Sequence, residues 1–211
     1  GPIFTSCCPS WVKYVERYHP ELIPNLASTR SPHIILGGIV KSFWANREGI
    51  DPRDISVISL MPCVSKKFEI EREELGISGM RPVDRVMTVR EAARMMKKEG
   101  INLAKADPSP PDDPFGRPSG SAVNYGVSGG VMESAFGHIG VKELTFREVS
   151  PGVRETEAVV DGKVVRAAVV NGLGNAKRLM GNGILDYHCV EVMACPDGCV
   201  GGGGQPMPSD S

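Results

Sequence analysis

The chain has 211 residues and a formal net charge of −1, with 24 basic and 25 acidic side chains. Hydrophobic residues make up 41% of the chain and charged residues 23%, which is ordinary usage for a globular protein that needs no disulfides to fold. One domain is the simplest arrangement for this length. No basic stripe indicates nucleic-acid binding, and no apolar run is long enough for a transmembrane helix. Because no signal peptide is evident, we expect a cytoplasmic protein, with the periplasm as the alternative.

The first fifth of the chain is predicted to be helical. A loop over residues 1–9 leads into a helix from Trp11 to Tyr18, where apolar side chains recur at helical spacing. Ser31-Pro32 is typical of a helix start, because proline is favoured at the first helical position. The mostly apolar helix that follows is expected to end at Gly49.

Two strands are predicted in the next part of the chain. The β-branched run Ile55–Met61 indicates a buried strand, which places Cys63 at a strand's carboxyl end. Binding groups often occupy that position in α/β proteins. Val83–Met87 is a second short strand, and Thr88 with Glu91 forms a capping box for the next helix.

The second half of the chain begins with a proline-rich loop over residues 106–122 and ends in a glycine-rich segment. Asp161-Gly162 is a strong hairpin signal between two strands. Helices and strands together predict an α/β fold with helices packed on mixed sheets. The other expected elements are a helix from Val131, strands Thr145–Val149, Val153–Val160 and Lys163–Val170, a helix Leu173–Met180 and a strand Cys189–Ala194.

Six cysteines are clustered in a way that suggests metal binding or redox chemistry. Two are adjacent, and two lie four residues apart beside a run of glycines. Clustered cysteines without a secretory signal seldom form a disulfide scaffold. Their spacing alone leaves three interpretations open: an iron–sulfur site, a zinc site or plain buried thiols. The cysteines are Cys7, Cys8, Cys63, Cys189, Cys195 and Cys199.

Three local motifs are more specific than the spacing. They are TSCCPSW at residues 5–11, MPCVSKKFE at 61–69, and EVMACPDGC at 191–199 followed by Gly201–Gly204. In this order they resemble the signature motifs of the catalytic domain of iron-only (FeFe) hydrogenases. The resemblance runs from Phe4 to Pro206. It implies a hydrogenase-like fold whose metal cluster is held in loops at the ends of helices and strands.

The resemblance also implies a role for each motif residue. Its cofactor would be the H-cluster: a 4Fe–4S cluster bridged by a cysteine to a two-iron subcluster with CO, cyanide and azadithiolate ligands. Cys7 would donate protons, Lys66 would contact a cyanide ligand, and Met61 and Met193 would pack around the two-iron unit. The 4Fe–4S ligands would be Cys8, Cys63, Cys195 and Cys199, of which Cys199 would be the bridge.

Each of these residues also has an ordinary structural interpretation. Without the motif, Cys7 would be a small buried side chain, Lys66 a surface lysine, and both methionines core residues. Cys189 lies outside the motifs and is interpreted as a structural thiol of a strand. Two positions depart from the family: Ala27 replaces a serine of its proton path, and His33 replaces a common glutamine. His33 would relay protons, tune the site, or be a neutral substitution.

The predicted reaction is the reversible reduction of protons to dihydrogen. Ferredoxin or a redox subunit would supply the electrons, and hydrogenase maturation proteins would install the two-iron unit. One alternative is a non-catalytic iron–sulfur relative, namely a cluster-assembly or prelamin-recognition-like protein. Another is a low-activity sensory hydrogenase, and a zinc module is more distant. Cys7 beside Cys8, together with both methionines and Lys66, favours the enzyme.

The family's domain has a further segment upstream of the TSCCPSW motif, which begins here at Thr5. That segment contributes to one of two lobes around the cluster. We therefore expect residues 1–211 to be the C-terminal part of the catalytic domain, completed by another segment or chain.

Overall fold

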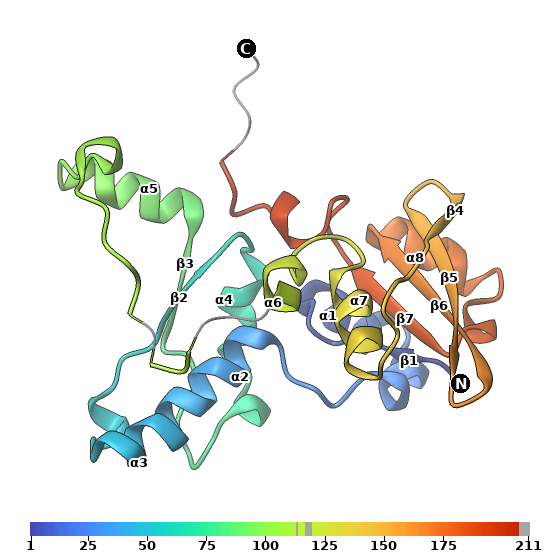
Figure 1. Cartoon of the computed structure of the whole chain (residues 1–211), viewed down its shortest axis with the longest axis horizontal. Helices are drawn as coiled ribbons and strands as arrows, with labels where there is room; N and C mark the ends of the chain where they lie inside the picture. Colours follow the sequence, from blue (N-terminus) through green and yellow to red (C-terminus); the bar gives the residue numbers. More distant parts are fainter. Residues whose placement is uncertain (113, 117–119, 207–211) are drawn as a thin grey trace. The chain divides into compact units, whose positions relative to one another are not determined.

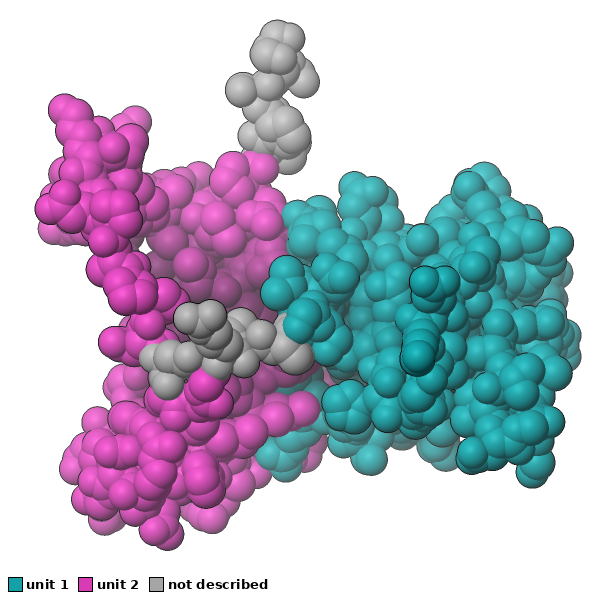
Figure 2. Space-filling view, viewed as in Figure 1, with its two compact units in different colours: residues 1–31, 119–201 teal, residues 32–118, 202–211 magenta. Residues whose placement is uncertain are grey.

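The structure, a computed structural model, describes residues 1–112, 114–116 and 120–206. It divides into two compact units, coloured separately in Figure 2. Unit 1 comprises residues 1–31 and 119–201, and unit 2 comprises residues 32–118 and 202–211. Unit 1 is thus assembled from two separate stretches of chain.

Unit 1 is built on a five-stranded mixed sheet in the order β1-β7-β6-β5-β4. The first three strands in this order run parallel, and β6, β5 and β4 are antiparallel neighbours. Asp161 and Gly162 have φ angles of 49° and 75°, which confirms the predicted hairpin between β5 and β6. The strands are β1 (Ile3–Phe4), β4 (Arg147–Ser150), β5 (Val153–Val160), β6 (Lys163–Asn171) and β7 (Cys189–Met193).

The expectation of a loop over residues 1–9 is wrong at β1. Ile3 and Phe4 pair with Cys189 and Val190 of β7, and Phe4 is fully buried. A strand of two residues has no periodicity, so only its pairing with a distant segment identifies it.

Helices cover both faces of the unit 1 sheet, as Figure 1 shows. One face packs against α1 (Pro9–Tyr18) and α8 (Leu173–Met180), and the other packs against α7 (Gly130–His138). Consecutive strand residues therefore serve different cores: Val170 faces α1 and α8, and Val169 faces α7. This alternation accounts for the continuous apolar sequence of β6 and β7.

Unit 2 begins with one long helical segment made of three parts: α2 (Pro32–Ile39), a π-helical stretch (Val40–Trp44) and α3 (Ala45–Glu48). It ends at Gly49 in the left-handed conformation, as predicted. The helix backbone at Gly37 lies directly against the backbone of Pro82. Glycine is required at this position, because a Cβ there would lie 2.3 Å from the Pro82 carbonyl oxygen. The segment thus packs closely on the core of Ile34, Ile70 and Val83.

The small sheet of unit 2 pairs β2 (Ile58–Met61) in parallel with β3 (Arg85–Thr88). The predicted capping box of Thr88 and Glu91 is present at the start of α5 (Val89–Lys98). The other short elements are α4 (Ser65–Glu69), α6 (Gly120–Asn124) and single helical turns at Pro20–Asn25, Pro52–Asp54, Glu73–Leu75, Leu103–Lys105, Ile184–Asp186 and Cys199–Gly201.

The prediction that Ile55–Met61 is a buried strand is wrong in one respect. The strand begins at Ile58, and the side chains of Ile58 and Leu60 are 61% and 58% exposed. Because side chains alternate along a strand, these two lie on one face, and Ser59 and Met61 lie on the half-buried other face. Large apolar side chains occupy the exposed face as well, so the sequence resembles that of a strand buried on both faces.

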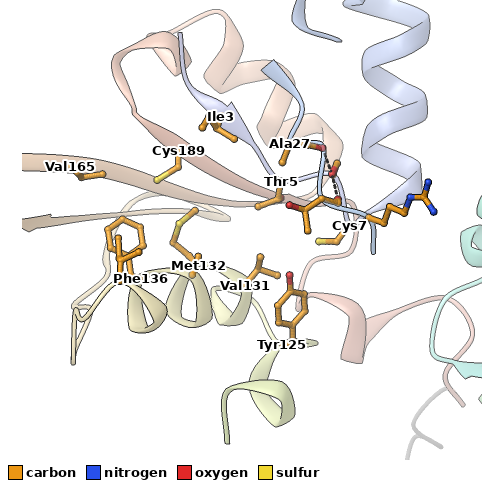
Figure 3. A pocket seen from close by; sticks show the side chains of 15 residues that line it. Ile3, Thr5, Cys7, Ala27, Tyr125, Val131, Met132, Phe136, Val165 and Cys189 are labelled. Carbon is orange, nitrogen blue, oxygen red and sulfur yellow. Dashed lines mark hydrogen bonds between the residues drawn. The ribbon is translucent and has the colours of Figure 1, made fainter. Parts of the chain in front are cut away.

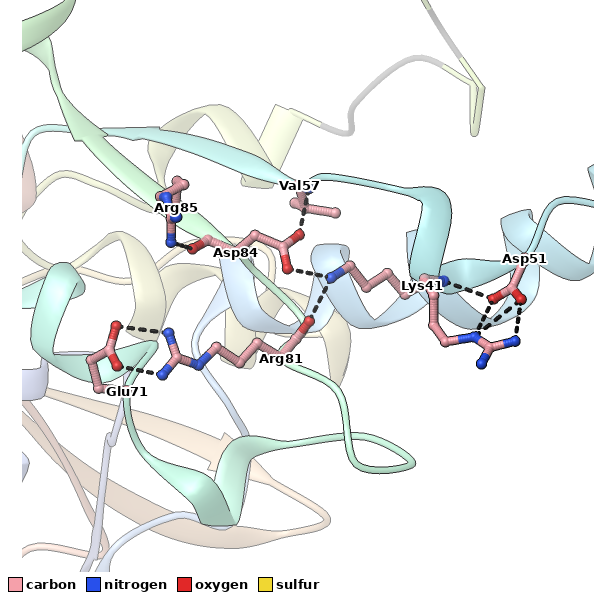
Figure 4. Close-up of polar contacts among 8 residues, drawn as sticks. Lys41, Asp51, Val57, Glu71, Arg81, Asp84 and Arg85 are labelled. Atoms are coloured by element: carbon pink, nitrogen blue, oxygen red, sulfur yellow. Dashed lines mark hydrogen bonds and ion pairs between the residues drawn. The ribbon is translucent and has the colours of Figure 1, made fainter.

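An ion pair between a buried lysine and a half-buried aspartate connects the long helical segment to the small sheet (Figure 4). Lys41, which is 6% exposed, donates to Asp84 Oδ1 at 2.7 Å and to the carbonyl of Arg81 at 2.8 Å. Asp84 Oδ2 in turn accepts the backbone N–H of Val57 at 2.7 Å. Asp84 therefore connects the helix to the segment that leads into β2.

Candidate functional site

The adjacent cysteines lie at the junction between β1 and α1. Cys8 is the N-cap residue of α1 in an extended conformation, and Pro9 begins the helix. Hydrogen bonds fix the residues before it: the hydroxyl of Ser6 donates to the carbonyls of Ala27 and Thr29 at 2.7 and 2.8 Å. The short β1 strand and these bonds hold the two thiols at a defined place on unit 1.

The two thiols have different surroundings. Cys8 is 9% exposed, and its Sγ accepts the backbone N–H of Ala194 at 3.5 Å. Hydrogen bonds to ligand sulfurs are one means by which proteins set the potential of an iron–sulfur cluster. Cys7 is only half-buried and lines a cavity. The structure therefore separates a buried sulfur beside the end of β7 from a sulfur that faces open space.

The loop from Cys195 to Cys199 is docked on the loop before α7. Gly198, with a φ of 79°, forms a bridge with Val127, and a Cβ on Gly198 would lie 2.7 Å from the backbone nitrogen of Ser128. Asn171 Nδ2 donates to the carbonyl of Cys195 at 3.2 Å. Only glycine permits this approach, so the backbone conformation of the loop is fixed from both ends.

A polar network supports the same loop from within unit 1. The hydroxyl of Ser128 contacts Asn171, and Arg154 donates to both the carbonyl and the hydroxyl of Ser128 at 2.8 Å. Glu191 is fully buried and accepts the N–H groups of Gly129 and Met132 at 2.7 and 2.8 Å. Burial raises the pKa of the Glu191 carboxyl, although these two N–H donors oppose the shift.

The cavity beside Cys7 has a volume of about 420 Å³ and lies within unit 1 (Figure 3). Its walls are mainly apolar and include Met132 and Phe136 of α7. The hydroxyl of Tyr125 points toward the side on which Cys7 lies. Burial, together with negative charge on Cys7 or Glu191, raises the pKa of Tyr125 to about 12, so the phenol stays protonated at neutral pH.

Cys189 lines the same cavity from β7. Burial raises the pKa of its thiol to about 11, which keeps the thiol uncharged at neutral pH. The neutral thiol packs beside the core of α7. These surroundings are those of the structural strand thiol inferred from the sequence.

Unit 2 contributes Met61, Cys63 and Lys66. Met61 ends β2, Cys63 follows after one proline, and Lys66 lies in α4. Gly204 packs on this turn: its N–H donates to the carbonyl of Pro62 at 2.8 Å, and a Cβ on it would lie 3.0 Å from the nitrogen of Cys63. The last glycine of the motif is therefore required for contact with the Cys63 turn.

Lys66 is a buried residue, and the interpretation of a surface lysine is wrong. It is 4% exposed, and its Nζ donates to Glu69 Oε2 at 2.9 Å. The same carboxylate oxygen lies 2.5 Å from Nε2 of His33. The neighbouring Lys67 is the half-exposed member of the pair and contacts Glu91.

Cys8, Cys63 and Cys189 carry free thiols. In the described part of the chain, no group of three His, Cys, Asp or Glu side chains is arranged to hold a single metal ion. Thiolates with backbone N–H donors and glycine-dependent loops suit an iron–sulfur cluster. Of the motif residues, Cys7, Cys8, Met193, Cys195 and Cys199 belong to unit 1, and Met61, Cys63 and Lys66 belong to unit 2.

Sequence analysis assigned no role to Glu69, Tyr125 or Glu191. Two signals were present. Glu191 is a single carboxylate in the otherwise apolar run of β7, and Glu69 lies three residues after Lys66, on the same helical face. The contacts of Tyr125 with the cavity depend on the tertiary fold and have no signal in the sequence.

Comparison with known proteins agrees with these features. The family model described as the iron-only hydrogenase large subunit, C-terminal domain, matches residues 1–203. The periplasmic Fe hydrogenase large subunit of Nitratidesulfovibrio vulgaris is 42% identical over 98% of this chain and 52% of its own length. A cytosolic Fe–S cluster assembly factor of Danio rerio is 36% identical over 99% of this chain and 55% of its own length.

Solved structures give the same result. An apo FeFe-hydrogenase from Chlamydomonas reinhardtii superposes with a TM-score of 0.86 at 36% identity, covering 99% of this chain and 63% of that one. The chain thus spans about half the length of the curated relatives named above. Of the helices that the structure describes, none has both the length and the hydropathy to cross a membrane.

Proposed function

Because the chain belongs to the iron-only hydrogenase large-subunit family, we propose that it catalyses the reversible reduction of protons to dihydrogen. The observation that carries this proposal is the pair Cys7–Cys8. Cys8 is buried against the end of β7, and Cys7 faces an apolar cavity. A buried sulfur and a thiol that faces open space are thus adjacent in sequence, and this difference supports a cluster ligand at Cys8 beside a proton donor at Cys7.

The cofactor we propose is the H-cluster. Its 4Fe–4S part would be held by Cys8, Cys63, Cys195 and Cys199. Cys199 would also bridge to the two-iron subcluster. When bound, the group supplies an electron reservoir and an open iron site. The buried sulfur of Cys8 and the glycine-dependent loop at Gly198 support this assignment.

The protein's own groups would move protons and hold anionic ligands. Cys7 Sγ would donate the transferred proton and would then be reprotonated from the side that faces the cavity. Lys66 Nζ, with three N–H donors, would bind a cyanide ligand while keeping its bond to Glu69. Met61 and the buried Met193 would exclude water from the site.

Several partners follow from this proposal. A ferredoxin-type carrier or a redox subunit would supply electrons, and maturation proteins would install the two-iron subcluster. We propose the cytoplasm as the compartment.

Cys7 offers the sharpest test, because Cys189 is a matched control thiol on the wall of the same cavity. The protein would be matured anaerobically, and hydrogen evolution and infrared bands of iron-bound CO and cyanide measured. Cys7→Ala is expected to keep the bands and lose activity at least about 100-fold, the usual scale of acid–base catalysis. Cys189→Ala should keep both. Full activity of Cys7→Ala would overturn the assigned role.

The cluster-assembly relatives, at 36% identity, support a second candidate: an iron–sulfur protein without hydrogenase activity. The same measurement separates the two. Bound iron and sulfide without CO and cyanide bands, after maturation that succeeds for a control hydrogenase, would favour the second candidate.

A further inference from the structure

His33 belongs to a buried ionic cluster in unit 2 that the proposed mechanism uses only in part. It lies in the first turns of α2 and is 9% exposed. Its Nε2 lies 2.5 Å from Glu69 Oε2, and its Nδ1 lies 3.1 Å from the hydroxyl of Ser59 in β2. Three separate elements therefore converge on one imidazole ring.

The cluster joins His33 to Lys66 through a single atom. Glu69 Oε2 contacts both the imidazole and the ammonium group, the latter at 2.9 Å. The side chains of His33, Lys66 and Glu69 are 7%, 4% and 6% exposed, so water screens their interactions weakly. Any change in the charge of the ring therefore alters the hold of Glu69 on Lys66.

The carboxylate is the stable anion of the cluster. Burial alone would raise its pKa, but hydrogen bonds and charge from His33 and Lys66 together hold the pKa of Glu69 below its usual value. With a neutral ring, Nε2–H donates to Glu69 and Nδ1 accepts from Ser59, and Glu69 balances Lys66 alone. With a protonated ring, Glu69 is shared between two cations.

We propose that His33 is a positioning residue that acts through Glu69 and sets how strongly the Lys66 ammonium group is held away from an anionic ligand. The proposal rests on the proposed function in one respect: the ligand that Lys66 would contact is a cyanide of the two-iron subcluster. A protonated ring weakens the Glu69–Lys66 pair and releases donor capacity of Lys66 toward that anion. A glutamine at this position would keep the hydrogen bond but could not change charge.

The first test needs no metal cofactor. The full chain is purified without metal cofactor, and its lysines are labelled with ¹⁵N at Nζ. The NMR signal of Lys66 is assigned with the variant Lys66→Met and followed against pH. We expect a pH-dependent step in the Lys66 signal of the wild type, and we expect His33→Gln to lose this step. His138→Gln removes an exposed histidine of unit 1 and should keep the step.

The second test uses the matured protein. The cyanide infrared bands should shift with pH in the wild type but not in His33→Ala. His33→Gln should restore the band positions of the neutral ring, also without pH dependence. If His33→Ala does not fold, His33→Gln alone still decides. An identical Lys66 titration in wild type and His33→Gln overturns the proposal. A third outcome is a pH-dependent step of the Lys66 signal in the protein without its metal cluster, together with no CO or cyanide bands after maturation. This outcome would support the positioning role of His33 and refute hydrogenase activity.

Discussion

Replacing Gly198 with alanine is expected to destabilise unit 1 and displace the loop that carries Cys195 and Cys199. Gly198 has a φ of 79°, and an L residue in this left-handed region costs about 1–2 kcal/mol. The added Cβ would also lie 2.7 Å from Ser128 N and 2.9 Å from the carbonyl oxygen of Gly126. Both atoms are backbone, so relief requires a backbone shift of about 1–3 kcal/mol. Together the two effects predict a loss of about 2–5 kcal/mol.

Urea denaturation of the cluster-free protein measures this loss, and anaerobic iron and sulfide content after reconstitution measures the displacement of the loop. Gly203→Ala is the matched control, because Gly203 lies in the same motif and a Cβ there would meet nothing within 4 Å. The control should change stability by less than about 0.5 kcal/mol. A Gly198→Ala protein as stable as the control would refute the argument that the loop requires glycine.

Two further substitutions test buried and capping contacts. Because burial raises the folded-state pKa of Glu191, the folded protein binds more protons than the unfolded one above the ordinary value of 4.5, and stability falls as pH rises through this window. Glu191→Gln should remove that slope and cost about 1–3 kcal/mol through the poorer acceptor at two N–H groups; an unchanged slope in urea titrations at several pH values would contradict the assignment. Thr88→Ala should cost about 1 kcal/mol, because Thr88 caps α5, with the exposed Ser56→Ala as a neutral control in the same denaturation assay.

Local signals predicted most elements of the fold. The hairpin at Asp161-Gly162 and the capping box at Thr88 depend on backbone geometry over two to four residues, so the sequence determines them almost alone. The pairing of β1 with β7 and the exposed face of β2 depend on partners far away in the chain. No local pattern contains that information.

The candidate site shows the same division. Its motif residues were found because their sequence pattern is long and specific, and the family relationship was confirmed. Their supporting groups were missed because a motif names residues without naming contacts. His33 lies 36 residues before Glu69, and Lys66 lies 3 residues before it. Only the fold brings the three side chains together.

The pairing of β1 with β7 also dictates an order of events during translation. Thr5 accepts a hydrogen bond from Val192, 187 residues later. At roughly 5–20 residues per second, this partner is synthesised on the order of 10–40 s after the N-terminal strand. Cys8 meets Ala194 on the same schedule, whereas residues 32–118 of unit 2 are already available to fold. A nascent chain that has not yet reached β7 therefore cannot present Cys7 and Cys8 in their final setting, and the metal loading that we propose would wait until synthesis has passed this strand.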